Sequence, residues 1–180
     1  MKLFIQIILN NMLPKLVLTD IDGVWTDGGM YYGESGEEFK RFSTYDSVGV
    51  IFLRLNNIPL GIITGEATTI VGRRASKLGI EYVYQGIRNK LQKARELTAE
   101  LGIKLRDVAY IGDEINDIPL MEECGYVAIP SDAPSYMDKY ADVRLDVQGG
   151  KGAFKEFVIH LLKQNELYDK TMEKYILSRR

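Results

Sequence analysis

The stretch KLVLTDIDGVWTDGG (Lys15–Gly29) decides the fold, because an apolar run ends in two aspartates one residue apart and a glycine follows at once. KLVLT (15–19) predicts a buried strand, and charged side chains are rarely buried unless something pairs with them. We expect Asp20 and Asp22 to lie on the same side of an extended backbone. Like charges that close raise each other's pKa unless a cation lies between them or one keeps a proton. The pair therefore indicates a functional site at the end of a strand.

Length and composition limit the kind of protein. The chain has 180 residues, of which 46% are hydrophobic and 27% are charged, with a net charge of -2. These values are typical of a globular domain with a full core, and they offer no basic surface for nucleic acid or an anionic membrane. The single cysteine, Cys124, excludes an internal disulfide and suits a reducing, cytoplasmic location. MKLFIQIILNNM (1–12) is too short to span a bilayer and has no cleavage site, so we expect an N-terminal extension.

Apolar β-rich runs alternate with helical patterns along the rest of the chain. After the first strand, the pattern predicts strands at 59–64, 81–85, 107–113, 126–130 and 142–145. Helices are predicted at 46–56, 67–79, 89–102, from the fourth strand through Met121, near 134–140 and at 153–163. The alternation predicts an α/β fold with a doubly wound parallel sheet over 13–164.

Two segments stand outside this alternation. VWTDGGMYYGESGEEFKRFS (24–43) has glycine-containing turns between aromatic, strand-like pieces, which predicts a β-hairpin standing out from the first loop. No other insertion is long enough to form a cap domain. The C-terminal tail, 165–180, is left without an assigned structure.

The polar residues of interest follow predicted strands. The carboxyl ends of parallel strands meet at one edge of a sheet, where such folds bind their ligands. The residues expected at this edge are Asp20 and Asp22, Thr64, Lys90, Asp113 and Asp117.

Three of these carboxylates suit a metal-assisted reaction. Asp20, Asp22 and Asp113 are hard oxygen ligands of the kind that Mg²⁺ prefers together with substrate phosphate. Asp20 can then attack phosphorus as a nucleophile. Asp22 can protonate the leaving alkoxide and afterwards deprotonate the water that hydrolyses the aspartyl-phosphate.

Phosphoryl transfer also needs positive charge and hydrogen-bond donors around the phosphoryl oxygens. Lys90 supplies the charge, and the Thr64 hydroxyl and the Thr64–Gly65 backbone N–H groups supply donors. Asp117 and Asn116 are expected to support the site, with Asp117 holding Lys90 or the water shell of the metal.

Each residue also has a simpler interpretation. Asp22 or Thr64 alone suits a helix N-cap, and Lys90 alone suits a solvated helix face. The simpler interpretations become less convincing as a set, because all of them would have to be true of residues that meet at the same edge of the sheet. Two other classes of protein remain open, a receiver domain that phosphorylates its own aspartate and a non-catalytic interaction subunit. A receiver lacks an acid two residues after the nucleophile, so Asp22 and the hairpin favour the enzyme.

The motifs resemble the four motifs of the haloacid dehalogenase superfamily. They are D-x-D-G-V (20–24), Thr64, Lys90 and G-D-x-x-x-D (112–117). The resemblance implies a Rossmann-like, HAD-like sheet, Mg²⁺ as cofactor, the first aspartate as nucleophile and the second as acid/base. Asp22 stands where the ATPase branch has threonine, which indicates a phosphatase.

Longer stretches resemble the capless sugar-acid phosphatases of this superfamily. They are DIDGVWTDGGMYY, IITGE, YQG…K, AYIGDEINDIP and GGKG. The resemblance implies action on 3-deoxy-D-manno-octulosonate 8-phosphate or 2-keto-3-deoxynononate 9-phosphate, intermediates of lipopolysaccharide and sialic acid biosynthesis. It also implies a homotetramer in which the hairpin and neighbouring chains replace the lid.

The two branches differ after the Thr-Gly of the second strand. This chain has Glu66 there and RRASK (73–77) in the next helix, which resembles the nine-carbon branch. Glu66 can accept hydrogen bonds from sugar hydroxyls, and Arg74 or Lys77 can bind the carboxylate. The simpler interpretation is a set of surface ion pairs. We expect the nine-carbon substrate, with the eight-carbon one as the alternative. Glu114 replaces the family's usual aspartate and is expected to change water positions only.

Overall fold

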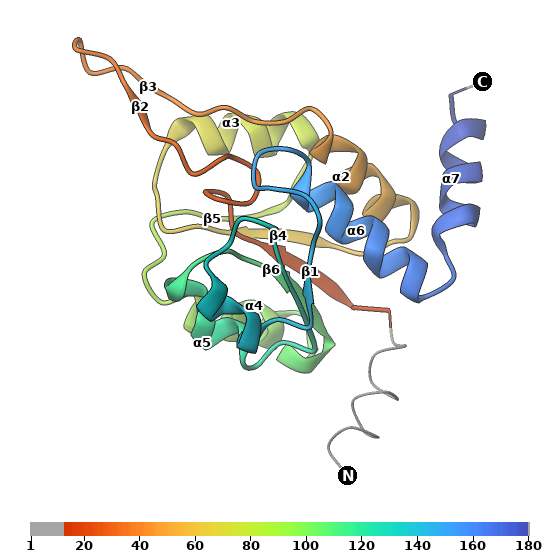
Figure 1. Cartoon of the computed structure of the whole chain (residues 1–180). Coiled ribbons are helices and arrows are strands. Elements are labelled where there is room, and N and C mark those ends of the chain that lie inside the picture. Colours follow the sequence, from red (N-terminus) through yellow and green to blue (C-terminus); the bar gives the residue numbers. More distant parts are fainter. Residues whose placement is uncertain (1–12, 180) are drawn as a thin grey trace.

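The computed structural model describes residues 13–179, which form a parallel sheet with helices on both faces (Figure 1). The strand order is β5-β4-β1-β6-β7-β8, and all neighbouring pairs run parallel. The strands are β1 (Leu16–Thr19), β4 (Leu60–Ile63), β5 (Tyr82–Tyr84), β6 (Val108–Ile111), β7 (Tyr126–Ile129) and β8 (Val143–Arg144). The predicted doubly wound α/β fold is confirmed. The expected N-terminal extension, 1–12, lies outside the described residues.

Alternation along β1 divides the core into two layers. Leu16 and Leu18 pack on one face of the sheet with α4 (Lys90–Glu100) and α5 (Ile118–Met121). Val17 points to the other face, which is covered by α2 (Asp46–Leu55), α3 (Thr69–Leu78) and α6 (Ala153–Gln164). All four residues of β1 are buried. A strand that is buried on both faces has a continuous apolar sequence, so residues 15–19 could be predicted as a strand from the sequence.

The helices begin and end where local signals predict. The Thr68 side chain accepts a hydrogen bond from Ile70 N–H at the start of α3, and Gly79 ends the helix with φ +64°. Asn89 caps α4 in the same way. The helix predicted after the fourth strand is short, because a 3₁₀ turn (Ile115–Asp117) precedes the four residues of α5. Near 134–140 the chain forms a 3₁₀ helix, Ser135–Tyr140. None of the helices in the described residues is long and apolar enough to cross a membrane.

The strand order reverses direction at β1, and such a position is the topological switch point of the sheet. The chain passes from β1 to β4 and β5 on one side, then crosses through α4 to β6 on the other side. Thr19 pairs with Ile111, and Asp20 N–H donates to the Ile111 carbonyl at 3.0 Å. The residues after β1 and β6 are therefore neighbours at the edge where open α/β sheets bind ligands.

A β-hairpin projects from the sheet edge (Figure 1). It consists of β2 (Tyr31–Tyr32) and β3 (Glu38–Phe39), which pair antiparallel. The aromatic side chains at its tip are solvent-exposed, with Tyr32 at 73% and Phe39 at 61%. The described residues contain no separate cap domain.

The C-terminal tail, which the sequence left unassigned, contains helix α7 (Tyr168–Leu177). Tyr168 and Tyr175 meet the ring of Phe52 edge-on, and Asn56 donates to the Thr171 hydroxyl at 2.9 Å. Helix α7 therefore packs against α2.

One buried carboxylate joins α2 to α6. Asp46, the first residue of α2, has no exposed surface, and its Oδ1 accepts a hydrogen bond from Lys155 N–H at 3.0 Å. Its Oδ2 is buried and has no partner among the described residues. Burial raises the pKa of Asp46 from 3.8 to about 6, although the Lys155 N–H and the charge of Arg74 oppose the rise. The ionised form is thus disfavoured in the folded protein.

Asp46→Asn is expected to change how stability depends on pH. Between pH 3.8 and 6 the folded wild type binds more protons at Asp46 than the unfolded chain, so this residue makes stability fall as pH rises through that window. Asparagine keeps the acceptor for Lys155 and removes that fall. Relative to wild type, the free energy of unfolding of the variant should be up to about 3 kcal/mol higher above pH 6 than it is below pH 3.8, at 1.36 kcal/mol per pKa unit. Chemical unfolding of both proteins from pH 4 to 8 measures it. The exposed Asp169→Asn serves as the control, and parallel stability curves would contradict the assignment.

Candidate active site

A buried lysine joins two aspartates at the switch point. Lys90, the first residue of α4, places its Nζ 2.5 Å from Asp20 Oδ2 and 2.6 Å from Asp117 Oδ1. Lys90 is 2% exposed, Asp20 is 5% exposed and Asp117 has no exposed surface. Burial tends to lower the pKa of Lys90, but the two carboxylates outweigh it and raise the pKa. The lysine therefore stays charged between its partners.

Asp117 uses its carboxylate to hold its surroundings. Oδ1 accepts from the Tyr110 hydroxyl at 2.5 Å in addition to Lys90. Oδ2 accepts from the backbone N–H groups of Asp113 at 3.0 Å and Glu114 at 3.3 Å. Because its carboxylate accepts four hydrogen bonds, Asp117 fixes the position of Lys90 and of the loop after β6.

Asp113 completes an acidic cluster at the same edge. One oxygen from each of Asp20, Asp113 and Asp117 lies within 4.8 Å of the others. Burial, followed by the charges of Asp20 and Asp117, raises the pKa of Asp113 to about 8. Burial also raises the pKa of Asp20 to about 6. Among the described residues no hydrogen bond reaches the Asp113 carboxylate, so Asp20 and Asp113 are the pair that suits a hard divalent cation.

Glycines make this close packing possible. A Cβ at Gly23, whose φ is +80°, would lie 1.9 Å from Asp113 Oδ2. A Cβ at Gly149 would lie 2.1 Å from the Gly23 carbonyl oxygen, and Gly150 N–H donates to the Val24 carbonyl at 3.0 Å. The GGKG motif (149–152) therefore packs directly on the loop that carries Asp22 and Gly23.

The structure places Asp22 differently from Asp20. Strand β1 ends at Thr19, and the N–H groups of Val24, Trp25 and Thr26 all point to the Ile21 carbonyl. The chain therefore turns at Ile21, so Asp22 lies in a turn and not in an extended segment, while both aspartates line the same cavity. The Asp22 carboxylate accepts from the Thr26 hydroxyl at 3.1 Å and, through both oxygens, from Lys40 Nζ at 2.6 Å. The Asp22 carboxylate does not belong to the acidic cluster.

A cavity of about 280 Å³ opens over these groups. Thr64 is buried at its wall, and Gly65 has open space where a side chain would be. Thr64 N–H donates to the Tyr84 carbonyl at 3.0 Å, so the expected donors at this position reduce to the Thr64 hydroxyl and Gly65 N–H. The cavity is lined by Asp20, Asp22, Gly23, Gly28, Met30, Thr64, Gly65, Glu66, Asp113, Glu114 and Asn116.

The residues predicted to contact the sugar are only partly at this cavity. Gly65 and Glu66 line it, and so does Asn116, which was predicted to support the site. Arg74 lies elsewhere, donating to the Ser43 carbonyl at 3.0 Å with its guanidinium over the Phe42 ring. Lys77 is exposed near the end of α3, which lies beside the start of β4 at the opposite edge of the sheet. Within one chain, the structure does not bring Arg74 and Lys77 to the cavity.

Glu114, the departure from the usual aspartate, lies at the rim. Its carboxylate accepts from Ile115 N–H at 2.7 Å and from the Tyr136 hydroxyl. It is outside the acidic cluster.

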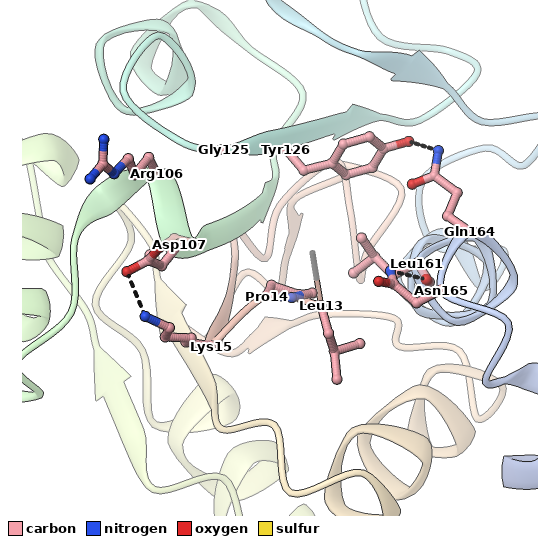
Figure 2. Close-up of a pocket in the computed structure, with 11 residues that line it drawn as sticks. Leu13, Pro14, Lys15, Arg106, Asp107, Gly125, Tyr126, Leu161, Gln164 and Asn165 are labelled. Atoms are coloured by element: carbon pink, nitrogen blue, oxygen red, sulfur yellow. Dashed lines mark hydrogen bonds and ion pairs between the residues drawn. The ribbon is translucent and has the colours of Figure 1, made fainter. Parts of the chain in front are cut away.

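A second cavity, of about 330 Å³, lies at the amino ends of the strands (Figure 2). Its walls come from the starts of β1, β6 and β7 and from the end of α6. Its carboxylate, Asp107, is already paired with Lys15 at 3.2 Å. This cavity therefore lacks the free carboxylates that the chemistry needs.

Sequence reasoning missed three features of the site. Tyr110 lies inside β6, where an apolar run gave no reason to single it out. Lys40 lies on the hairpin, and no spacing rule links it to Asp22. The pair Gly149–Gly150 was noticed only as part of a motif, although two adjacent glycines indicate a close approach of backbones.

Comparison with known proteins identifies the family. Residues 44–125 match the model for haloacid dehalogenase-like hydrolases. A relative from Salmonella typhi, 3-deoxy-D-manno-octulosonate 8-phosphate phosphatase KdsC, is 38% identical over 154 residues, which are 85% of this chain and 82% of the relative. A probable YrbI family phosphatase from Pseudomonas syringae superposes with a TM-score of 0.89 at 35% identity, covering 95% of this chain and 97% of the other.

A third similar protein was solved with ligands. The 3-deoxy-D-manno-octulosonate 8-phosphate phosphatase from Moraxella catarrhalis, in complex with magnesium, phosphate and KDO, superposes with a TM-score of 0.88 at 32% identity. The alignment covers 94% of this chain and 97% of that one.

The chain belongs to the haloacid dehalogenase-like hydrolases. Within this family it is one of the capless sugar-acid phosphatases, so it is a phosphoric monoester hydrolase. The receiver-domain and interaction-subunit interpretations are thereby excluded.

Proposed function

We propose that this enzyme hydrolyses 3-deoxy-D-manno-octulosonate 8-phosphate to the free sugar acid and phosphate. The observation that carries this proposal is the pair of neighbouring carboxylates, Asp20 and Asp113, beside Thr64 in an open cavity. The named activity of the relatives supports the eight-carbon substrate better than the nine-carbon one.

Mg²⁺ is the cofactor that this donor set suits. Asp20 and Asp113 would hold it. Each Asp20 oxygen accepts a single hydrogen bond and keeps a lone pair, whereas each Asp117 oxygen accepts two and both Asp22 oxygens contact the Lys40 ammonium. When bound there, the ion would neutralise charge on the phosphate and favour the ionised form of both carboxylates, against the burial that raises their pKa. The prediction that Asp22 is also a metal ligand through its carboxylate requires that carboxylate to leave Lys40.

Asp20 is the proposed nucleophile. Ile21 N–H holds its Oδ1 at 2.7 Å and Lys90 holds its Oδ2, so the carboxylate cannot rotate freely. Attack forms a bond from an Asp20 oxygen to phosphorus and breaks the bond to the sugar oxygen. The Thr64 hydroxyl and Gly65 N–H lie at the cavity as donors for the phosphoryl oxygens, whereas Lys90 does not line the cavity and places its positive charge beside Asp20.

Asp22 is the proposed acid and base. It lines the cavity and its side chain is 20% exposed. For the first step Asp22 must enter as the carboxylic acid, and it gives that proton to the departing sugar oxygen and becomes the carboxylate. In the second it takes a proton from the water that attacks phosphorus, which releases phosphate and restores Asp20.

The nine-carbon substrate remains a second candidate because of one residue. Glu66 lines the cavity and is exposed, so its carboxylate is available to the hydroxyls of a longer sugar. A site built around hydroxyl groups discriminates strongly against a substrate that lacks them.

The two candidates are tested by kcat/KM on both sugar-acid phosphates, with Mg²⁺ and with EDTA. We expect activity only with Mg²⁺ and a higher kcat/KM on the eight-carbon substrate. Glu66→Ala should lower both values by a similar small factor, with Glu66→Gln as the isosteric control. A preference for the nine-carbon substrate that Glu66→Ala abolishes would establish the second candidate, and hydrolysis unaffected by EDTA would contradict the metal site.

The protein is also proposed to be a cytoplasmic homotetramer. The exposed aromatics of the hairpin, Tyr31, Tyr32 and Phe39, support association with other copies, because a monomer would leave an apolar projection in water. The proposed domain covers 13–164, with 1–12 and 165–180 as extensions.

A further inference from the structure

Lys40 is half-buried and lies at the base of the hairpin, one residue after β3. Its side chain has no exposed surface, whereas that of the next cation, Arg41, is 54% exposed. A buried ammonium group is unfavourable unless all its donors are satisfied. Lys40 Nζ contacts both oxygens of Asp22 at 2.6 Å and Met30 Sδ at 3.6 Å. The lysine is thus committed to Asp22.

The contact with both oxygens fixes the orientation of the Asp22 carboxylate. A single hydrogen bond would let the carboxylate group rotate, and Thr26 supplies only one, to Oδ1. Lys40 on both oxygens restricts that rotation. Because Asp22 follows the turn at Ile21 rather than a strand, no β-ladder hydrogen bonds hold it there.

We propose that Lys40 is a positioning residue that holds the Asp22 carboxylate toward the leaving oxygen of the substrate. This inference rests on the proposed role of Asp22 in proton transfer. It makes the hairpin part of the catalytic machinery of its own chain, because the hairpin delivers the lysine. Lys40 itself does not line the cavity, so it acts through Asp22.

The test compares two leaving groups. A sugar alkoxide needs a proton from Asp22 to depart, whereas p-nitrophenolate is a stable anion and departs without one. The measured quantity is kcat/KM, which reports the steps up to transfer of the phosphoryl group to Asp20. Lys40→Met should lower kcat/KM about 10- to 100-fold on 3-deoxy-D-manno-octulosonate 8-phosphate and about twofold on p-nitrophenyl phosphate. The loss on the sugar substrate should appear in kcat rather than in KM.

Matched variants separate positioning from other effects. Arg41→Met removes the neighbouring exposed cation and should leave both substrates unchanged. Lys40→Arg keeps a donor to Asp22 and should recover part of the activity. Adding Lys40→Met to Asp22→Asn should cause no further loss, because both changes remove the same interaction.

Three outcomes would overturn the inference. They are equal losses on both substrates, a loss confined to KM, and additive losses in the double variant. Asp22→Asn alone tests the proposed function separately. If that variant loses activity equally on both substrates, Asp22 is not the acid. If its loss is selective and that of Lys40→Met is not, only the positioning role fails.

Discussion

Asp20→Asn is expected to reduce phosphate release by at least about 10⁴-fold on every substrate, as replacement of a nucleophile in a covalent mechanism does. The asparagine amide is a poor nucleophile and carries no charge for a cation. Acid-quenched wild-type enzyme should contain a phosphorylated aspartate in single turnover, and the variant should contain none. Phosphate release and phosphopeptide mapping measure the two effects.

Asp107→Asn is the matched control for this experiment. Asp107 is also next to a strand of the sheet, but it lies at the amino end of β6 and pairs with Lys15. It should keep full activity. Near-normal turnover by the Asp20 variant, or phosphate trapped on another residue, would remove Asp20 from its role.

Lys90→Met is expected to lower both activity and stability. The substitution leaves Asp117 with no exposed surface and no counter-charge, and removal of one partner from a buried ion pair costs about 3–5 kcal/mol. Activity should fall at least about 100-fold, because the positive charge that holds the Asp20 carboxylate beside the cavity is lost. Thermal unfolding in EDTA and kcat/KM with Mg²⁺ measure the two effects independently.

Lys93→Met is the matched control on the same helix, because it removes a lysine charge from the surface and leaves the buried ion pairs of Lys90 intact. Lys93 is partly exposed, with 29% of its side chain accessible, and pairs with Glu96 one turn along α4. Surface pairs of this kind contribute little, so the control should resemble wild type. Equal stability of the two variants would show that the Asp20–Lys90–Asp117 network contributes nothing to folding.

The sheet was predictable because local patterns and global topology agree. β1 is a continuous apolar run, and Gly79 and Asn89 mark helix ends by their own conformational preferences. Once the strands were known, the rule about carboxyl ends was enough to bring Asp20 and Asp113 together. The prediction needed no side-chain detail, because backbone register fixes these positions.

The remaining features depend on how the backbone turns between elements. Asp22 lies in a turn and not in an extended segment, since three N–H groups donate to the Ile21 carbonyl. Lys40 reaches Asp22 because it lies at the base of the projecting hairpin, next to the loop that carries Asp22. Lys77 is far from the cavity because α3 runs away from it at about 1.5 Å per residue. Periodicity predicts elements well, but it does not predict where a loop places its side chains.

The position of β1 in the middle of the sheet has a consequence for folding kinetics. Asp20 and Asp113 come from opposite halves of the sequence, so they meet only after the crossover through α4 has closed the long-range pairing of β1 with β6. Contacts of such large sequence separation form slowly. A chain emerging from the ribosome therefore cannot acquire its cation before β6 has been synthesised, and cation uptake should mark a late event in refolding.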